Sequence, residues 1–401
     1  MSNRERKKFM AKDNIFLRKR IKKLVEFMKA NKIDISIISS PENVFYYSNF
    51  NPIIGSHPAF VIIKQNGEYI LLVHCIRNAH AQEENSVNNI LLYGKWGKNT
   101  PIALDYMDAI EIILKEKNLK IGLEKKFSSI EFCEKLEEKN KNSNFYDISK
   151  FISNEKIIKD EYEISCIKKA AFLTDIGVET AIEYLKKGYS EAEACTEGQY
   201  QMRKAWHKYF PDCEVSGFWT SEGGQVDSLV VWSMANERIS YGCDCPIHYV
   251  PKDGDIVLPM AWARVNGYAA ENERTIILKE ENEFVNKAYL SVLKAREEVF
   301  KILKPGTSFE ELYLAAEKVF IENGFKEILP GRIGHGLGLS THEFPSLAKG
   351  NKLKLSPGMV FTVEPGLMSK DWGGVRHSDT VLITEDGFEF LTKLKRNKIN
   401  I

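Results

Sequence analysis

The segment DIVLPMAWARVNGYAAENERTIIL, residues 255–278, constrains the fold more than any other stretch of the chain. It consists of two mostly apolar runs joined by Asn266-Gly267. An Asn-Gly dipeptide between such runs favours a two-residue type I′ hairpin turn. A turn at this position pairs Val265 with Tyr268 and so fixes the register of both strands. The sequence therefore predicts a regular antiparallel hairpin here.

The register brings two carboxylates together. Counting back from the turn, Trp262 lies opposite Glu271 and Met260 lies opposite Glu273. Because side chains alternate between the two faces of a strand, these four residues share one face. Two like charges on an apolar strand are costly, so they require a positive partner or a raised pKa for one of them. The neighbouring Met and Trp indicate the wall of a site rather than open surface.

Length and composition exclude several classes of protein. A chain of 401 residues predicts two domains of ordinary size. The formal net charge of +1 gives no electrostatic case for nucleic-acid binding, and no apolar run is long enough to cross a membrane. Seven cysteines without a C-x-x-C pair suit a reducing compartment, and the basic N-terminus lacks the apolar core of a secretory signal. We expect a cytoplasmic protein.

The chain changes character near residue 155. Before this point strand and helix patterns alternate, including AFVIIKQNGEYILLVH, which predicts a hairpin with a type I′ turn at Asn66-Gly67. After it, apolar residues recur at helical spacing from residue 160 until Gly188 ends the pattern. We therefore predict one domain over residues 1–155 and a second over 156–401.

Three further segments place polar groups in apolar surroundings. The glycine-rich GRIGHGLGLSTHEFPSL carries His335 and His342, and glycines let the backbone approach a ligand closely. The apolar strand PGMVFTVEPGL ends at Glu364. The segment WGGVRHSDTVLITEDG brings Arg376 and His377 into another strand. These side chains are candidates for a common site.

In order and spacing, these four segments resemble the pita-bread family, which includes methionine aminopeptidase, Xaa-Pro aminopeptidase, prolidase and creatinase. The motifs cover residues 254–392. The resemblance implies an α/β (α+β) protein, with an N-terminal creatinase/prolidase-type α/β domain followed by a C-terminal pita-bread domain. It also implies a homodimer, with the loop around His57 as the place where a partner would be contacted. An ordinary connection is the other interpretation of that loop, and the one we favour.

The metallopeptidases of this family bind two metal ions through Asp, Asp, His, Glu and Glu. Carried over by position, these ligands fall on Met260, Glu271, His335, Glu364 and Ser378. A thioether is a poor ligand for Mn²⁺ or Zn²⁺, and a serine hydroxyl cannot replace the carboxylate that bridges two cations about 3.5–4 Å apart. A two-metal centre is therefore not expected. One ion on Glu271, His335 and Glu364 stays open, because three ligands plus water suit a catalytic site.

Within the family, the pattern G-Y-x-x-x-x-E-R-T resembles creatinase, which hydrolyses a C–N bond without metal. There the glutamate at the position of Glu273 helps to hold a substrate guanidinium. Two departures stand out: creatinase keeps a second carboxylate where this chain has His377, and its general-base histidine falls on Cys243 or a neighbour. The general base is therefore unassigned.

The leading interpretation is a creatinase-like hydrolase that cleaves a C–N bond in a small cationic or amidine-like molecule, without metal or other cofactor. The expected catalytic residues are His335, His342, Glu364, Glu273 and Glu271. The expected substrate-binding residues are Trp262, Met260, Arg376, His377, Trp232 and Cys243. The imidazoles would transfer protons, and the carboxylates and indole rings would hold the cation.

Two other functions remain open. One is an Xaa-Pro dipeptidase or aminopeptidase with a single Mn, Co or Zn ion on Glu271, His335 and Glu364. The other is a non-catalytic binding protein that kept the fold after two ligands were lost. In that last case the basic N-terminal helix would carry a partner; otherwise the expected partners are a small-molecule substrate and a second copy of the chain, which completes a homodimer.

Overall fold

The computed structural model describes residues 15–84, 89–115, 118–220, 227–242, 244–279 and 282–399. Two compact units emerge from the contacts within the chain: residues 1–155 with 217–226, and residues 156–216 with 227–401. Within the described ranges, no helix is both long enough and apolar enough to cross a membrane.

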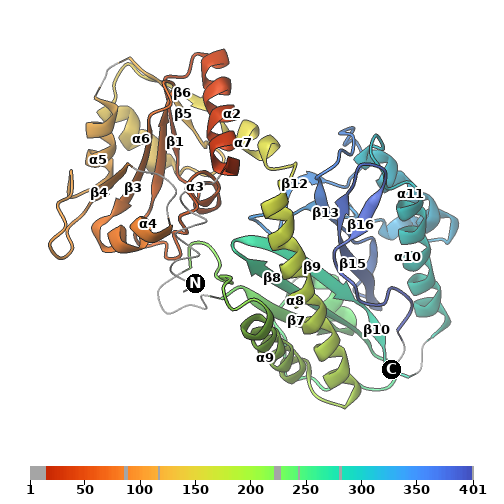
Figure 1. Ribbon diagram of the computed structural model, residues 1–401. Helices are drawn as coiled ribbons and strands as arrows, with labels where there is room; N and C mark the ends of the chain where they lie inside the picture. Colours follow the sequence, from red (N-terminus) through yellow and green to blue (C-terminus); the bar gives the residue numbers. More distant parts are fainter. Residues whose placement is uncertain are drawn as a thin grey trace. The chain divides into compact units, whose positions relative to one another are not determined.

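The first unit is built on a six-stranded mixed sheet in the order β4-β3-β2-β1-β5-β6 (Figure 1). Its strands are β1 (Ile35–Ile38), β2 (Phe60–Lys64), β3 (Tyr69–His74), β4 (Ile90–Tyr93), β5 (Lys120–Leu123) and β6 (Asn144–Asp147). Its helices are α2 (Ile15–Asn31), α3 (Pro41–Ser48), α4 (Asn78–Glu84), α5 (Tyr106–Leu114), α6 (Ile130–Lys139) and α7 (Ser149–Glu155). Thr220 also belongs to this unit: its N–H donates to the Ile53 carbonyl, and its carbonyl accepts from the N–H of Gly55. A single domain boundary at residue 155 does not include this segment.

The hairpin of β2 and β3 forms as predicted, but its turn differs. Ile63 pairs with Tyr69, and the Lys64 amide donates to the Glu68 carbonyl, so the loop holds three residues rather than two. Gly67 has a φ of 90°, whereas Asn66 has no positive φ. A three-residue loop of this kind needs only one residue in the left-handed region, and the glycine supplies it.

The second unit contains a ten-stranded sheet whose main path is β10-β8-β9-β15-β13-β11-β12, with β7 on β8 and with β14 and β16 on β15. Its strands are β7 (Leu229–Ala235), β8 (Ile256–Val265), β9 (Tyr268–Arg274), β10 (Ile276–Ile277), β11 (His335–Gly336), β12 (Glu343–Ser346), β13 (Val360–Val363), β14 (Gly366–Ser369), β15 (Gly373–Ile383) and β16 (Phe388–Phe390). Its helices are α8 (Glu161–Lys186), α9 (Glu191–Tyr209), α10 (Glu283–Lys301) and α11 (Phe309–Glu322). In Figure 1, the pair α8 and α9 lies along β7 to β9, whereas α10 lies beside β15 and packs against α11.

Helix α8 begins and ends at the residues that the sequence predicts. Asp160 accepts a hydrogen bond from the backbone N–H of Glu163, and the Glu163 carboxylate accepts one from the N–H of Asp160, which forms a capping box. Gly188, with a φ of 85°, follows the last turn. The helix predicted from residue 160 onward is therefore confirmed.

The β8–β9 hairpin also follows the prediction. Asn266 and Gly267 both have positive φ values, 48° and 85°, as a type I′ turn requires. The observed pairs include Val265 with Tyr268, Trp262 with Glu271, and Met260 with Glu273. The two glutamates are therefore neighbours on one face of the sheet, and each is at most 2% exposed.

Candidate functional site

Neighbouring strands bring the site together. Glu271 and Glu273 lie on β9, which pairs with β15. On the other side of β15 lies β13, and Glu364 follows its last residue. His335 opens β11, which pairs with β13. Residues that are 93 positions apart in the chain, from 271 to 364, thus meet because their strands are close in one sheet.

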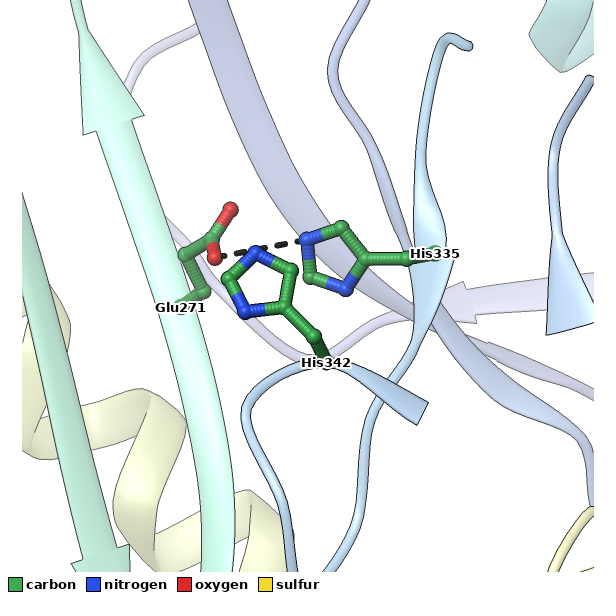
Figure 2. Close-up of side chains that lie close together, drawn as sticks. All are labelled: Glu271, His335 and His342. Carbon is green, nitrogen blue, oxygen red and sulfur yellow. Dashed lines mark ion pairs between the residues drawn. The ribbon is translucent and has the colours of Figure 1, made fainter. Parts of the chain in front are cut away.

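His335 stands between two carboxylates. Its Nε2 lies 3.6 Å from an oxygen of Glu271 and 3.3 Å from an oxygen of Glu364. Figure 2 shows the ring directed toward Glu271. Its Nδ1 is 3.1 Å from the Gly336 carbonyl, which can only accept, so Nδ1 carries a proton and Nε2 is the nitrogen left to face the carboxylates. The Nε2 atom is buried and makes no hydrogen bond of good geometry.

A neutral His335 would direct a lone pair at two carboxylate oxygens, which is unfavourable unless a proton or a cation lies between them. In the absence of a metal ion the ring itself takes that proton. Burial lowers the pKa of His335, but the adjacent Glu364 and Glu271 outweigh burial and raise it to about 9. The site therefore demands positive charge at Nε2.

Glu271 is held on both oxygens. The Trp262 indole N–H donates to Oε2 at 2.8 Å, and the Ser378 hydroxyl donates to Oε1 at 2.8 Å. Burial, and next the charge of Glu364, raises the pKa of Glu271. The sequence did not reveal the role of Ser378 as a donor, because only the pairing of β15 with β9 places it there.

We expect Trp262→Phe to weaken divalent-ion binding about 10- to 100-fold, because a ligand loses the hydrogen bond that orients it. Calorimetric titration of Mn²⁺ into metal-free protein measures this change. Trp232→Phe is the matched control: the Trp232 ring lies 5.2 Å from that of Trp262, centroid to centroid, and among the tryptophans that the structure describes only Trp262 donates from its indole to Glu271. Equal affinities in both variants would show that the indole N–H does not support Glu271.

Glu273 finds its positive partner within the chain. Arg376 donates to both carboxylate oxygens, from Nε to Oε2 and from Nη2 to Oε1 at 2.6 Å. Its Nη2 also lies 3.8 Å from the sulfur of Met260. Burial still raises the pKa of Glu273, although Arg376 opposes this shift. The carboxylate that sequence comparison assigned to a substrate guanidinium thus binds a guanidinium of the protein.

His342 lies beside His335 but is exposed. The two ring centroids are 4.2 Å apart. The next residue, Glu343, is anchored by Lys156 at 3.3 Å and Lys159 at 3.5 Å. Sequence reasoning missed these two lysines, which hold Glu343, the first residue of β12, directly after His342. An exposed imidazole next to buried carboxylates can reach a substrate.

One of the predicted substrate-binding residues, His377, lies away from the site. His377 is fully buried on the opposite face of β15, where its Nε2 lies 2.8 Å from the hydroxyl of Tyr289 on α10. Alternation along the strand explains this, since its neighbours Arg376 and Ser378 point to the site. Cys243 lies outside the described residues.

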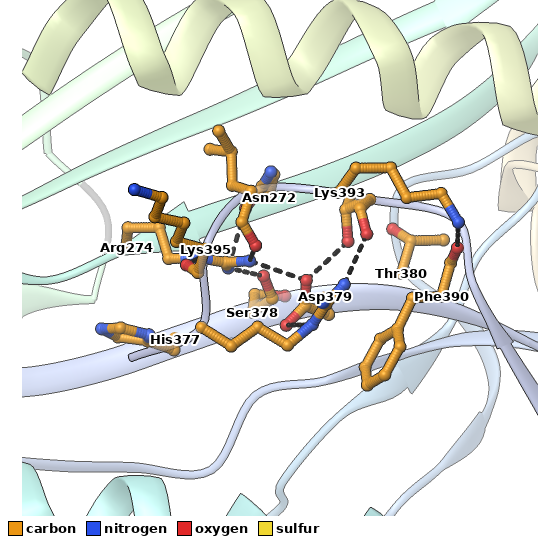
Figure 3. A network of polar contacts seen from close by, with 12 residues as sticks. Asn272, Arg274, His377, Ser378, Asp379, Thr380, Phe390, Lys393 and Lys395 are labelled. Atoms are coloured by element: carbon orange, nitrogen blue, oxygen red, sulfur yellow. Dashed lines mark hydrogen bonds and ion pairs between the residues drawn. The ribbon is translucent and has the colours of Figure 1, made fainter. Parts of the chain in front are cut away.

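The opposite face of the same strands carries a charged network that the sequence did not predict. Asp379 is fully buried and binds Arg274 at 2.7 Å, Arg296 of α10, and the Thr392 hydroxyl at 2.7 Å. Figure 3 shows Arg274 and Asp379 side by side in this network. The run RHSDT, residues 376–380, places polar residues on both faces of the strand, and this is the sequence feature that could have predicted a second polar network.

Comparison with known proteins identifies the family. The profile of metallopeptidase family M24 matches residues 165–385, which is more than half of the chain. The chain belongs to metallopeptidase family M24. Residues 20–155 match the creatinase/prolidase N-terminal domain. The predicted pita-bread fold is therefore confirmed, and so is a hydrolase family acting on C–N bonds.

Individual M24 relatives resemble the chain over nearly its whole length. It is 32% identical to an Xaa-Pro dipeptidase of Pyrococcus furiosus over 95% of this chain and 99% of the relative. The solved prolidase of Pyrococcus furiosus superposes with a TM-score of 0.78 at 29% identity, covering 92% of this chain and 99% of that one. The prolidase of Pyrococcus horikoshii gives 0.80 at 28% identity, covering 95% and 100%.

These findings correct the leading interpretation. The prediction of a metal-independent, creatinase-like hydrolase without a cofactor is wrong, because the chain is an M24 metallopeptidase similar throughout to Xaa-Pro dipeptidases. The geometry agrees with this correction. Ligand atoms of Glu271, Glu273 and Glu364 lie within 4.8 Å of one another, as do those of Glu271, His335 and His342.

The residues fit one divalent ion better than two. His335 offers an unused, buried nitrogen to the same place as the oxygens of Glu271 and Glu364. One imidazole and two carboxylates form a suitable ligand set for a catalytic metal. Where a second ion would need further carboxylates, the chain offers the thioether of Met260 and the hydroxyl of Ser378.

Proposed function

We propose that this protein is a dipeptidase of the Xaa-Pro type that uses one divalent metal ion bound by Glu271, His335 and Glu364. The observation that carries the proposal is the buried Nε2 of His335, which has no hydrogen bond and faces two carboxylates. The Xaa-Pro dipeptidase of Pyrococcus furiosus, similar over 95% of this chain, supports the substrate class.

When bound, a divalent ion at these residues polarises the scissile carbonyl and lowers the pKa of a water molecule. The surrounding residues hold the ligands in place. Trp262 and Ser378 orient Glu271, and the contact between Nδ1 and the Gly336 carbonyl directs the other nitrogen of His335 into the cluster.

Cleavage of an Xaa-Pro bond also requires a proton for the proline nitrogen that leaves. His342 is exposed beside His335, so its imidazole can exchange protons with solvent and contact the substrate. Although the residue is exposed overall, its ring is partly desolvated against the site; this desolvation, and next the proximity of His335, lowers the pKa of His342. A proton on this ring is therefore readily given up.

Hydrolysis assays on protein stripped with chelator test the proposal. We expect cleavage of Met-Pro and Leu-Pro only after Mn²⁺, Co²⁺ or Zn²⁺ is restored, and little cleavage of Leu-Leu, which serves as the matched substrate. Elemental analysis should find about one ion per chain in the active protein. Full activity in verified metal-free protein, or no cleavage of Xaa-Pro dipeptides with any of these ions, would refute the proposal. The homodimer and the cytoplasmic location stay predictions.

A further inference from the structure

A cation of the protein itself, Arg376, is bound to the acidic cluster at the proposed ion site. The guanidinium of Arg376 binds both oxygens of Glu273, which is 1% exposed. Met260 is the direct cross-strand partner of Glu273, and its sulfur lies 3.8 Å from Nη2 of Arg376. The guanidinium of Arg376 and the thioether of Met260 thus lie together beside Glu273.

Counting charges shows what this arrangement does. Three buried carboxylates, those of Glu271, Glu273 and Glu364, carry three negative charges when ionised. Arg376 offsets one of them. One divalent ion, bound with a neutral His335, offsets the other two and leaves the cluster neutral. A second divalent ion would leave two excess positive charges in a buried site, which is strongly unfavourable.

We infer that Arg376 is the fixed second cation of this site, and that the site therefore binds a single divalent ion. The inference rests on the ion site of the proposed function, but not on the identity of the peptide substrate. Arg376 acts through electrostatics: its positive charge neutralises Glu273 and lowers the affinity of the cluster for divalent ions.

A competing role for Arg376 gives the opposite prediction. If Arg376 only positioned Glu273 as a ligand for a second ion, its removal would weaken ion binding. If Arg376 is itself the second cation, its removal leaves the cluster more negative, and a divalent ion binds more tightly. Removing a unit charge beside a divalent ion in a partly buried site changes affinity by at least about tenfold.

The test is a calorimetric titration of Mn²⁺ into chelator-treated wild-type protein, Arg376→Lys and Arg376→Gln. We expect one Mn²⁺ per chain in the wild type, at least about tenfold tighter binding in Arg376→Gln, and an affinity within about threefold of wild type in Arg376→Lys, which keeps the charge. Two ions in the wild type, or unchanged or weaker binding in Arg376→Gln, would overturn the inference.

Glu273→Gln provides a second test if Arg376→Gln does not fold, as judged by circular dichroism. This variant keeps the guanidinium and removes one negative charge, so we expect about tenfold weaker binding with the stoichiometry still at one. A fall from two ions to one would instead identify Glu273 as a ligand. Failure to cleave Xaa-Pro dipeptides, with these titrations as expected, would refute the proposed substrate and leave the inference intact.

Discussion

His335→Ala is expected to lower kcat/KM for an Xaa-Pro dipeptide by about a thousandfold. The substitution removes the one nitrogen ligand of the proposed ion and leaves only Glu271 and Glu364 to hold it. Loss of a bound metal forfeits several kcal/mol of transition-state stabilisation, and each 1.4 kcal/mol is a factor of about ten. Steady-state kinetics at saturating Mn²⁺, with elemental analysis of the desalted protein, measure both effects.

A suitable control for this variant is His207→Ala, because His207 is an exposed histidine on α9 that contacts none of the site residues. It should retain wild-type kinetics and metal content. If His335→Ala kept more than a tenth of the wild-type kcat/KM with its metal content intact, His335 would not be a metal ligand.

Asp379→Asn is expected to destabilise the second unit by about 3–5 kcal/mol, which is typical of breaking a buried ion pair on one side. Asp379 is fully buried, and its carboxylate is the counter-charge for Arg274 and Arg296. The amide would leave two buried guanidinium groups without compensation. Urea unfolding followed by tryptophan fluorescence measures the loss, and the exposed Asp386→Asn should change stability by less than about 0.5 kcal/mol.

The same network predicts a dependence on pH. Burial alone would raise the pKa of Asp379, but Arg274 and Arg296 outweigh burial and hold it well below its usual range. A depressed folded-state pKa contributes stability that is present above the unfolded value of about 3.9 and is lost as the pH falls toward the folded value. The stability difference between wild type and Asp379→Asn should therefore be constant from pH 7 to 5 and shrink below about pH 4. A difference that persists undiminished at pH 3 would exclude a charge effect.

The local geometry of the site was predictable wherever one turn fixed it. Asn266-Gly267 determines the register of β8 and β9, and with it the shared face of Met260, Glu271 and Glu273. At Asn66-Gly67 the same dipeptide misled, because the loop uses only the glycine in the left-handed region. A dipeptide signal cannot distinguish a two-residue loop from a three-residue loop when both place glycine at the same position.

The rest of the site depends on strand pairing between distant segments, which no local pattern encodes. The pair Ser378 with Glu273 aligns β15 with β9 and thereby places Arg376 on the Glu273 carboxylate. Without this register the sequence gives Glu273 no partner within the chain and favours an external cation, and the change at two ligand positions favours a site without metal over one with a single ion. The buried carboxylates of Glu271 and Glu364 around His335 indicate a cation site, although Met260 and Ser378 occupy two of the family's ligand positions.

Strand β15 divides its work between its two faces. On one face, Arg376 binds Glu273 and Ser378 donates to Glu271. On the other face, Asp379 connects the sheet to α10 through its ion pair with Arg296. Substitutions on the site face of β15 are therefore expected to change the site without breaking the ion pairs on the opposite face. A library randomised at Arg376, Ser378 and Met260 would change the side chains of the site and leave the buried Asp379 network on the opposite face intact. Strand β15 is therefore a suitable starting point for redesigning the site.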